Sequence, residues 1–282
     1  MVDRRRWPAP AKINLFLHVV GKREDGYHLL QTIFQFLDYG DELAFTLTED
    51  GKIGRNYDFG FSEKQDLCLR AAKLLKPFAE THHGVIIDLY KRLPMGGGLG
   101  GGSSNAATVL IALNKLWNIG FSRNKLAQLG LQLGADVPVF VEGRAAWAEG
   151  VGEQLSPIDL NEPWYLVLIP EIEVSTAQVF ANKHLTPTPR MKKIRALENA
   201  EQMQFGENQL QALVAEDFPI VAKHLDWLSQ FGPARMTGSG ACVFAPVADK
   251  ASGDRILERL PEATRGFVAK GMNIHPLFED DC

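Results

Sequence analysis

The chain has 282 residues, of which 45% are hydrophobic and 23% are charged, and its formal net charge is −4. This is the composition of a globular protein with one large or two ordinary domains, and it argues against a general nucleic-acid-binding or anionic-membrane surface. The three cysteines, Cys68, Cys242 and Cys282, show no metal-ligand spacing and fit free thiols in a reducing cytosol. The basic start of the chain has no apolar run behind it, so we expect no signal peptide and a cytoplasmic protein.

Residues 11–20 alternate between apolar and other side chains, which predicts a strand with Lys12 and Asn14 on the same face. A lysine at the start of a strand is usually a solvated end, so this position alone does not indicate catalysis. Asp25-Gly26 predicts a turn, followed directly by Tyr27 and His28. Further strands are expected at 32–37 and 41–48, and a helix at 66–78.

The most informative stretch is residues 94–104, which holds six of the chain's 26 glycines. The β-branched run at 85–93 predicts a strand before it, and the periodic run at 105–117 predicts a helix after it. Glycine lets a ligand approach the backbone, and the first turn of a helix offers free N–H groups and a positive dipole end. The stretch therefore predicts a phosphate-binding loop.

Three other interpretations of this stretch are weaker. A flexible linker does not need two serines at the mouth of a helix. The P-loop motif is absent because no lysine lies between Pro94 and Lys115. Gly96, Gly98 and Gly101 formally match the dinucleotide fingerprint, but no acidic residue occurs from 103 to 135 to hold a ribose.

A second helix is expected from Ser122, as N-cap, to about residue 133. Asp136 is the first acidic residue after the glycine stretch and lies in an apolar setting before Pro138, where it either caps a turn or serves a reaction. Strands are expected at 145–149 and 164–169, with a domain boundary near 155–162.

In the second half, Ser175-Thr176 predicts a helix start, and Phe180 lies on the same helical face as Thr176. Residues 182–195 predict an exposed loop. Helices are expected at 207–215, 218–230 and 249–260, and a strand at 266–272. A second glycine turn, residues 234–244, enters an apolar strand.

Three segments in this order resemble the GHMP kinase superfamily: residues 10–15, 94–104 and 237–241. The resemblance implies an α+β protein with the two-domain GHMP kinase fold. The N-terminal ATP-binding domain, residues 1–158, would resemble ribosomal protein S5 domain 2. The C-terminal domain, residues 159–282, would be ferredoxin-like.

Residues 25–28 and 134–138 narrow the resemblance to a branch of the superfamily in the non-mevalonate isoprenoid pathway. Its members use ATP to phosphorylate the 2-hydroxyl of a cytidine diphosphate-linked methylerythritol. The resemblance implies that Lys12 and Asp136 form the catalytic pair and that Lys91 lines the adenine pocket. It implies that the ATP phosphates are bound by Pro94, Met95, Gly96, Gly97, Gly98, Leu99, Gly100, Gly101, Gly102, Ser103 and Ser104.

For the other substrate, the resemblance implies that Tyr27 and Phe180 sandwich the cytosine and that His28 bonds the base edge. Asn14 would contact the methylerythritol, and Thr176 would lie beside the cytosine site. One departure is Asp66, where the family often has asparagine, which questions one adenine contact.

The chemistry of phosphoryl transfer implies Mg²⁺, although no carboxylate cluster identifies its ligands; Ser103 or Ser104 can offer a hydroxyl. We expect ATP and a small-molecule substrate as partners, no nucleic acid, no membrane, and a monomer or weak homodimer. The rivals are another small-alcohol kinase of the superfamily, a non-enzymatic RNA-binding protein with an S5-like domain, and a nicotinamide reductase.

Overall fold

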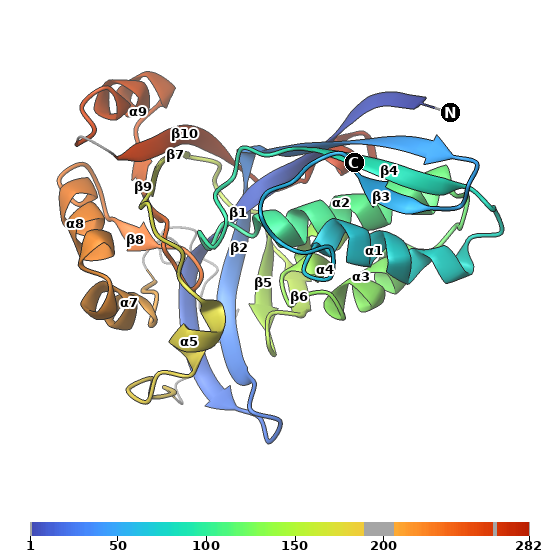
Figure 1. Cartoon of the computed structure of the whole chain (residues 1–282). Coiled ribbons are helices and arrows are strands. Elements are labelled where there is room, and N and C mark those ends of the chain that lie inside the picture. The colour runs from blue at the N-terminus through green and yellow to red at the C-terminus, as the bar shows by residue number, and fades with distance from the viewer. Residues whose placement is uncertain (1, 189–205, 262–263, 282) are drawn as a thin grey trace.

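The computed structural model describes residues 2–188, 206–261 and 264–281. Its centre is a long antiparallel hairpin of β1 (Val2–Lys22) and β2 (His28–Thr48) (Figure 1). The two segments predicted at 32–37 and 41–48 are parts of the single strand β2. The pairing continues past Gly40 with a shift of register, because the missing side chain lets Gly40 lie against the backbone of Ala9.

The first half of the chain builds helices onto one side of this hairpin. Its elements are β3 (Ile53–Arg55), α1 (Leu67–Leu75), η1 (Lys76–Phe78), β4 (Gly84–Tyr90), α2 (Gly101–Leu116), α3 (Arg123–Leu131), α4 (Val137–Glu142), β5 (Ala146–Glu149) and β6 (Gln154–Pro157). Strand β4 pairs with β2 on one edge and with β3 on the other. Helix α1 packs on α2, and α4 packs on both α2 and α3.

The second half lies on the other side of the hairpin (Figure 1). Its elements are β7 (Trp164–Ile169), α5 (Thr176–Phe180), α7 (Gln211–Asp217), α8 (Pro219–Leu228), β8 (Arg235–Met236), β9 (Val243–Val247), α9 (Lys250–Leu257), β10 (Arg265–Met272) and η3 (Pro276–Asp281). Strand β10 pairs with β7 and, through Gly271 and Met272, with β2. One sheet therefore runs through both halves, in the order β3-β4-β2-β10-β7-β9-β8.

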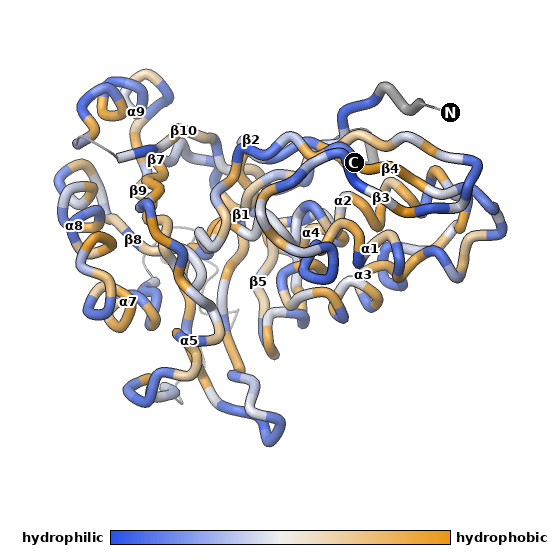
Figure 2. The backbone as a smooth tube through the Cα atoms, viewed as in Figure 1, coloured by the Kyte–Doolittle hydropathy of each residue, from blue (hydrophilic) through white to orange (hydrophobic). Residues whose placement is uncertain are grey.

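Both halves also contribute to one apolar core. Ile13 and Leu15 of β1 belong to the same buried cluster as Val167 and Phe244 of the second half. Figure 2 shows apolar residues along β4, β5 and β9 and a hydrophilic tip on the β1–β2 hairpin. The domain boundary between residues 158 and 159 remains a prediction, and the core and sheet continue across it.

Most elements expected from the sequence are present within a few residues. Strands β3 and β6 and helix α4 were not predicted, because each has only three to six residues and little periodicity. In the predicted exposed loop, residues 182–188 are exposed or half-buried, and residues 189–195 lie outside the described part.

Two further expectations concern the cysteines and membranes. Cys68 and Cys242 are free and buried, and burial raises the pKa of each thiol to about 12; Cys282 lies outside the described residues. Among the helices of residues 2–188, 206–261 and 264–281, none combines the length and apolarity that crossing a membrane demands.

The end of the chain returns to the first half and buries a histidine there. His275 is fully buried, and its ring makes an edge-to-face contact with the ring of Phe36. Its backbone N–H donates to the carbonyl of Gly143. Its Nδ1 accepts from the N–H of Leu277 at 3.1 Å. Burial lowers the pKa of His275 to about 3, so the ring is neutral in the folded protein.

This histidine makes folding stability depend on pH. In the unfolded chain, histidine gains a proton below about pH 6.5, whereas the folded protein resists protonation down to about pH 3. The contribution of His275 to the free energy of unfolding is therefore complete above about pH 6.5 and decreases as the pH falls. Between pH 7 and pH 5 we expect wild type to lose about 2 kcal/mol more unfolding free energy than His275→Gln. Urea unfolding of both proteins at each pH measures this difference, and parallel losses would contradict it.

Candidate functional site

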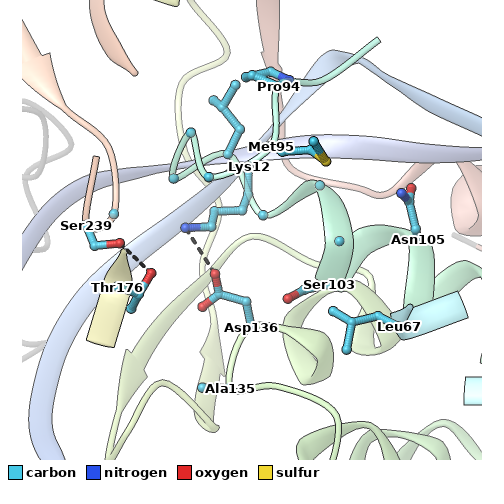
Figure 3. A pocket seen from close by; sticks show the side chains of 18 of the residues that line it. Lys12, Leu67, Pro94, Met95, Ser103, Asn105, Ala135, Asp136, Thr176 and Ser239 are labelled. Atoms are coloured by element: carbon cyan, nitrogen blue, oxygen red, sulfur yellow. Dashed lines mark hydrogen bonds and ion pairs between the residues drawn. The ribbon is translucent and has the colours of Figure 1, made fainter. Parts of the chain in front are cut away.

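A cavity of about 490 Å³ lies where the hairpin, the glycine stretch, α5 and the second glycine turn meet. Lys12, Asp136, Thr176 and Ser239 are grouped on its wall beside the glycine stretch (Figure 3). Its lining includes every residue from 94 to 103. The cavity thus collects side chains from both halves of the chain.

The glycine stretch has the predicted order of strand, loop and helix. Gly96, Gly98 and Gly100 have positive φ angles, which glycine adopts without strain. The loop is held by neighbouring backbone: the N–H of Lys12 donates to the carbonyl of Leu99, and that of Cys242 donates to Gly97. At Gly98, an added Cβ would lie 2.2 Å from the carbonyl oxygen of Thr237, so the two glycine turns touch.

Helix α2 begins directly at this loop. Its N-cap is Gly100, which has no side chain to cap the first turn, so the N–H groups there remain available to an anion. Ser103 faces the cavity, whereas the hydroxyl of Ser104 is buried away from it with no hydrogen-bond partner among the described residues. Of the two serines, Ser103 is therefore placed to meet a ligand.

Lys12 and Asp136 form an ion pair at the mouth of the loop, with 3.2 Å between Nζ and Oδ2 (Figure 3). The side chain of Lys12 is 3% exposed and that of Asp136 is 32% exposed. Gly100 makes room for the lysine, because a Cβ there would lie 3.0 Å from its Cγ. Asp136 precedes α4 but makes no side-chain capping bond, so the capping alternative is wrong.

Asn14 lies beside Lys12 on the same face of β1, as the alternation predicted. Its Oδ1 accepts from Lys12 Nζ at 2.6 Å. Its backbone N–H donates to the hydroxyl of Thr237, in the second glycine turn, at 3.0 Å. The second half of the chain thus directly contacts the strand that carries the lysine.

Asp41 holds the residues just before the glycine stretch, and no sequence pattern predicted this role. This buried carboxylate accepts from Lys91 Nζ at 2.7 Å and from the N–H groups of Arg92 and Leu93 at 2.7 and 2.8 Å. It also accepts from Asn105 Nδ2 at 3.1 Å. Lys91 lines the cavity, and its ammonium donates to Asp41 and to the Leu93 carbonyl. Its place in an adenine pocket remains a prediction.

The carboxylate of Asp66, where the family often has asparagine, makes hydrogen bonds that stabilise the local structure. Its Oδ1 caps α1 by accepting from the N–H groups of Cys68 and Leu69. Its Oδ2 accepts from Arg55 and from the hydroxyl of Tyr57, each at 2.8 Å. Four donors fill the acceptor positions of this carboxylate. It forms part of the cavity wall, as do Phe59 and Phe61 nearby.

At the opposite end, the predicted base-binding residues lie on the hairpin and on α5. Phe180 lines the cavity, as does Thr176, which shares a 2.8 Å hydrogen bond with Ser239. His28 stacks on Phe180 with 5.4 Å between ring centroids, and burial followed by the charge of Lys22 lowers its pKa. Neither His28 nor Tyr27, which is 63% exposed, contributes to the cavity wall.

Comparison with known proteins agrees with this fold. The family of GHMP kinases N terminal domains matches residues 66–144, and that of GHMP kinases C terminal domains matches residues 189–265. A crystal structure of 4-(cytidine 5'-diphospho)-2C-methyl-D-erythritol kinase superposes with a TM-score of 0.81 at 32% identity, covering 95% of this chain and 99% of the other. A mevalonate kinase superposes with a TM-score of 0.67 at 17% identity, which shows the shared fold alone. Fold and site together define a GHMP kinase, and the predicted fold class is confirmed.

Curated relatives narrow the class further. The 4-diphosphocytidyl-2-C-methyl-D-erythritol kinase of Thiobacillus denitrificans is 53% identical over 97% of this chain and 97% of its own. The kinase of the same name from Alkalilimnicola ehrlichii is 55% identical over 95% of this chain and 91% of its own. The chain therefore belongs to the 4-diphosphocytidyl-2-C-methyl-D-erythritol kinase family.

The contact between the glycine turns yields a test. Gly98→Ala and Gly96→Ala both place an L-residue at positive φ, which costs about 1–2 kcal/mol. Only at Gly98 does the new Cβ clash with backbone, since at Gly96 the nearest atoms all belong to Glu173 and lie 3.4 Å away or more, which is ordinary contact. We expect Gly98→Ala to weaken ATP binding at least tenfold more than Gly96→Ala in titration calorimetry. Equal affinities would show that the contact does not shape the loop.

Proposed function

We propose that this protein transfers the γ-phosphoryl group of ATP to the 2-hydroxyl of 4-(cytidine 5'-diphospho)-2-C-methyl-D-erythritol, giving the 2-phosphate and ADP in the non-mevalonate isoprenoid pathway. The observation that carries the proposal is the Lys12–Asp136 pair at the mouth of the glycine loop. The family supports the substrate and the reaction. We further propose that the protein acts in the cytoplasm as a monomer or weak homodimer, without nucleic-acid or membrane partners.

The pair supplies what phosphoryl transfer needs. The reaction depends on in-line placement and on stabilising charge more than on covalent help. Asp136 accepts the proton of the attacking hydroxyl, while the ammonium of Lys12 holds that carboxylate in place and stabilises negative charge on the transferred group. The N–H groups of the loop and of the first turn of α2 bind the phosphates of ATP.

The residues at this point also fit Mg²⁺. The described residues contain no group of three or more histidine, cysteine or acidic side chains that would form a complete metal cage. Mg²⁺ bound to nucleotide usually takes one or two protein ligands beside phosphate and water oxygens. Asp136 and the hydroxyl of Ser103, both on the cavity wall, would be the protein ligands of such an ion. The ion would neutralise phosphate charge.

The base of the second substrate fits the α5 end of the cavity. Phe180 offers an aromatic face there, and Thr176 and Ser239 supply hydroxyls. We propose that cytosine stacks on Phe180, with Tyr27 on its other face, and that His28 bonds its edge. Because the pKa of His28 is lowered, the imidazole is neutral at pH 7 and offers one donor and one acceptor. Asn14 is placed to contact the methylerythritol beside Lys12.

Adenine would occupy the opposite end, beside Lys91 and Asn105. The Nδ2 of Asn105 is bonded to Asp41, and its buried Oδ1 has no hydrogen-bond partner in the described part of the chain. Sequence reasoning missed this residue because an asparagine inside a helix has no local signature. The Asp66 side chain, with its acceptor positions filled, serves as wall here and not as a base contact.

An ADP-release assay tests the reaction against its nearest rival. We expect turnover with the cytidylated methylerythritol and none above background with mevalonate or homoserine. The reason is that only the first substrate carries a base to stack on Phe180. Turnover with mevalonate or homoserine alone would replace this function with that of another small-alcohol kinase. RNA binding without any turnover would favour the S5-like alternative.

The catalytic pair gives a direct prediction. Lys12→Ala and Asp136→Asn should each fold and lose at least about 100-fold in kcat, the usual size for a lost acid–base or charge-stabilising group. The matched control is the exposed Lys250–Asp254 pair, with 2.7 Å between its charged atoms. Lys250→Ala and Asp254→Asn should keep wild-type kcat. Near-normal turnover in either site variant would remove that residue from the mechanism.

The base site gives a second prediction. Phe180→Ala should weaken binding of the cytidylated substrate by about 1–3 kcal/mol, the value of one stacking face. The affinity of the Phe180→Ala variant for ATP should change less than twofold, because the glycine loop is a separate part of the cavity. Phe78→Ala, at an exposed ring that packs on Phe121, is the control and should alter neither affinity. A lower melting temperature with an unchanged substrate Kd would instead make Phe180 a packing residue.

A further inference from the structure

The side-chain amide of Asn14 has a fixed orientation beside Lys12, and the importance of this orientation for catalysis rests on the proposed function. A side-chain amide has an oxygen that accepts and an NH₂ group that donates, and the two ends have nearly the same shape. Only the oxygen attracts the ammonium of Lys12, which lies 2.6 Å away. With the amide reversed, two donors would face each other there.

Thr32 on β2 decides between these two orientations. Its hydroxyl donates its single hydrogen to the carbonyl of Phe16 at 2.5 Å. The hydroxyl oxygen then has only lone pairs to offer the Asn14 amide, whose Nδ2 lies 2.8 Å away. The NH₂ group must therefore face Thr32, and the oxygen must face Lys12.

A bulge in the hairpin makes the carbonyl of Phe16 available to Thr32. The register of β1 against β2 shifts between Asn14, opposite Phe34, and Leu17, opposite Thr32. β1 thus has one extra residue in this interval, and a bulge interrupts the ladder of backbone hydrogen bonds locally. The carbonyl of Phe16 accepts the threonine hydroxyl at this irregular point.

The other neighbour of the amide does not fix its orientation. The hydroxyl of Thr237 lies 3.4 Å from Asn14 Oδ1 and 3.3 Å from the carbonyl of Gly98, so its hydrogen has two alternative acceptors. Lys12, Asn14 and Thr32 contribute to the cavity wall, but each residue as a whole is at most 2% exposed. A reversed amide would therefore have little access to water that could satisfy it.

We propose that Thr32 is a positioning residue: it orients the Asn14 amide, and the amide oxygen in turn holds the ammonium of Lys12 beside Asp136. Thr32 acts through Asn14 and does not touch the transferred phosphate. Loss of its hydroxyl should lower kcat more than it changes the binding of ATP.

Thr32→Val and Thr32→Ser form the first part of the test. Valine keeps the shape and removes the hydroxyl, so we expect kcat to fall at least tenfold while the Kd for ATP changes less than twofold. Serine keeps the hydroxyl and should stay within threefold of wild-type kcat. Thr32→Ala, which also lacks the hydroxyl, replaces the valine variant if circular dichroism shows that valine does not fold.

Thr108→Val is the matched control for a buried threonine. The hydroxyl of Thr108 donates to the carbonyl of Pro8 at 3.0 Å, and the residue does not line the cavity. This variant should lower the melting temperature and leave kcat unchanged. An equal loss of kcat in Thr108→Val and Thr32→Val would mean that general destabilisation explains both.

A double-mutant cycle with Asn14→Ala completes the test, with single-turnover rates measured at high enzyme concentration. If Thr32 acts through Asn14, adding Thr32→Val to Asn14→Ala should change the rate less than twofold. An equal tenfold loss in both backgrounds, or normal kcat in Thr32→Val alone, would overturn the proposal. Both of these outcomes are measured against an active wild-type enzyme. Failure of the proposed function itself would instead appear as no turnover in the wild type.

Discussion

The site depends on one buried ammonium group. Placing a lysine charge out of water costs several kcal/mol unless partners compensate for it. Lys12 obtains that compensation from Asp136 and from the oxygen of Asn14, and its stem passes through space that Gly100 leaves open. Because the side chain of Asp136 is more exposed than that of Lys12, the carboxylate is the more accessible of the two groups from the cavity. The ammonium is buried and is bonded to the Asn14 oxygen. The arrangement is suited to chemistry at Asp136 more than to stability.

The long hairpin brings the parts of this site together. β1 carries Lys12 and Asn14, and its neighbour β2 carries Thr32 and, further along, Asp41. The first glycine stretch is bonded to Lys12 through Leu99 and to the second glycine turn through Gly97. Since β10 pairs with β2, the two halves share one sheet, and β1 and β2 at its centre contribute residues to the cavity wall. Placing these residues on paired strands suits a reaction that depends on bringing two substrates into line.

The sequence predicted the glycine loop between a strand and a helix because its signal is local: glycines between a strand pattern and a helix pattern. The roles proposed for Lys12 and Asp136 came from the family resemblance, since neither position is informative alone. Asp41, Thr32 and Asn105 were missed because their partners are far along the chain; Asp41 and Asn105 are 64 residues apart. The length of β2 was underestimated because Gly40 interrupts the alternation, although pairing with β1 carries the strand past it. Helix α4 has six residues, which is too short for a periodic pattern to predict it. Only the contacts of Asp136 distinguish the capping alternative from a role in a reaction, because they depend on the folded structure.

The central claim is that Asp136 accepts a proton during one direct transfer and does not itself take the phosphoryl group. The stereochemistry at phosphorus tests this, using ATP whose γ-phosphorus is made chiral with oxygen isotopes and sulfur. Each in-line displacement inverts the configuration. One direct transfer predicts inversion at phosphorus in the 2-thiophosphate product, read by phosphorus NMR. Retention would require two displacements through a phosphorylated residue and would contradict the role given to the Lys12–Asp136 pair.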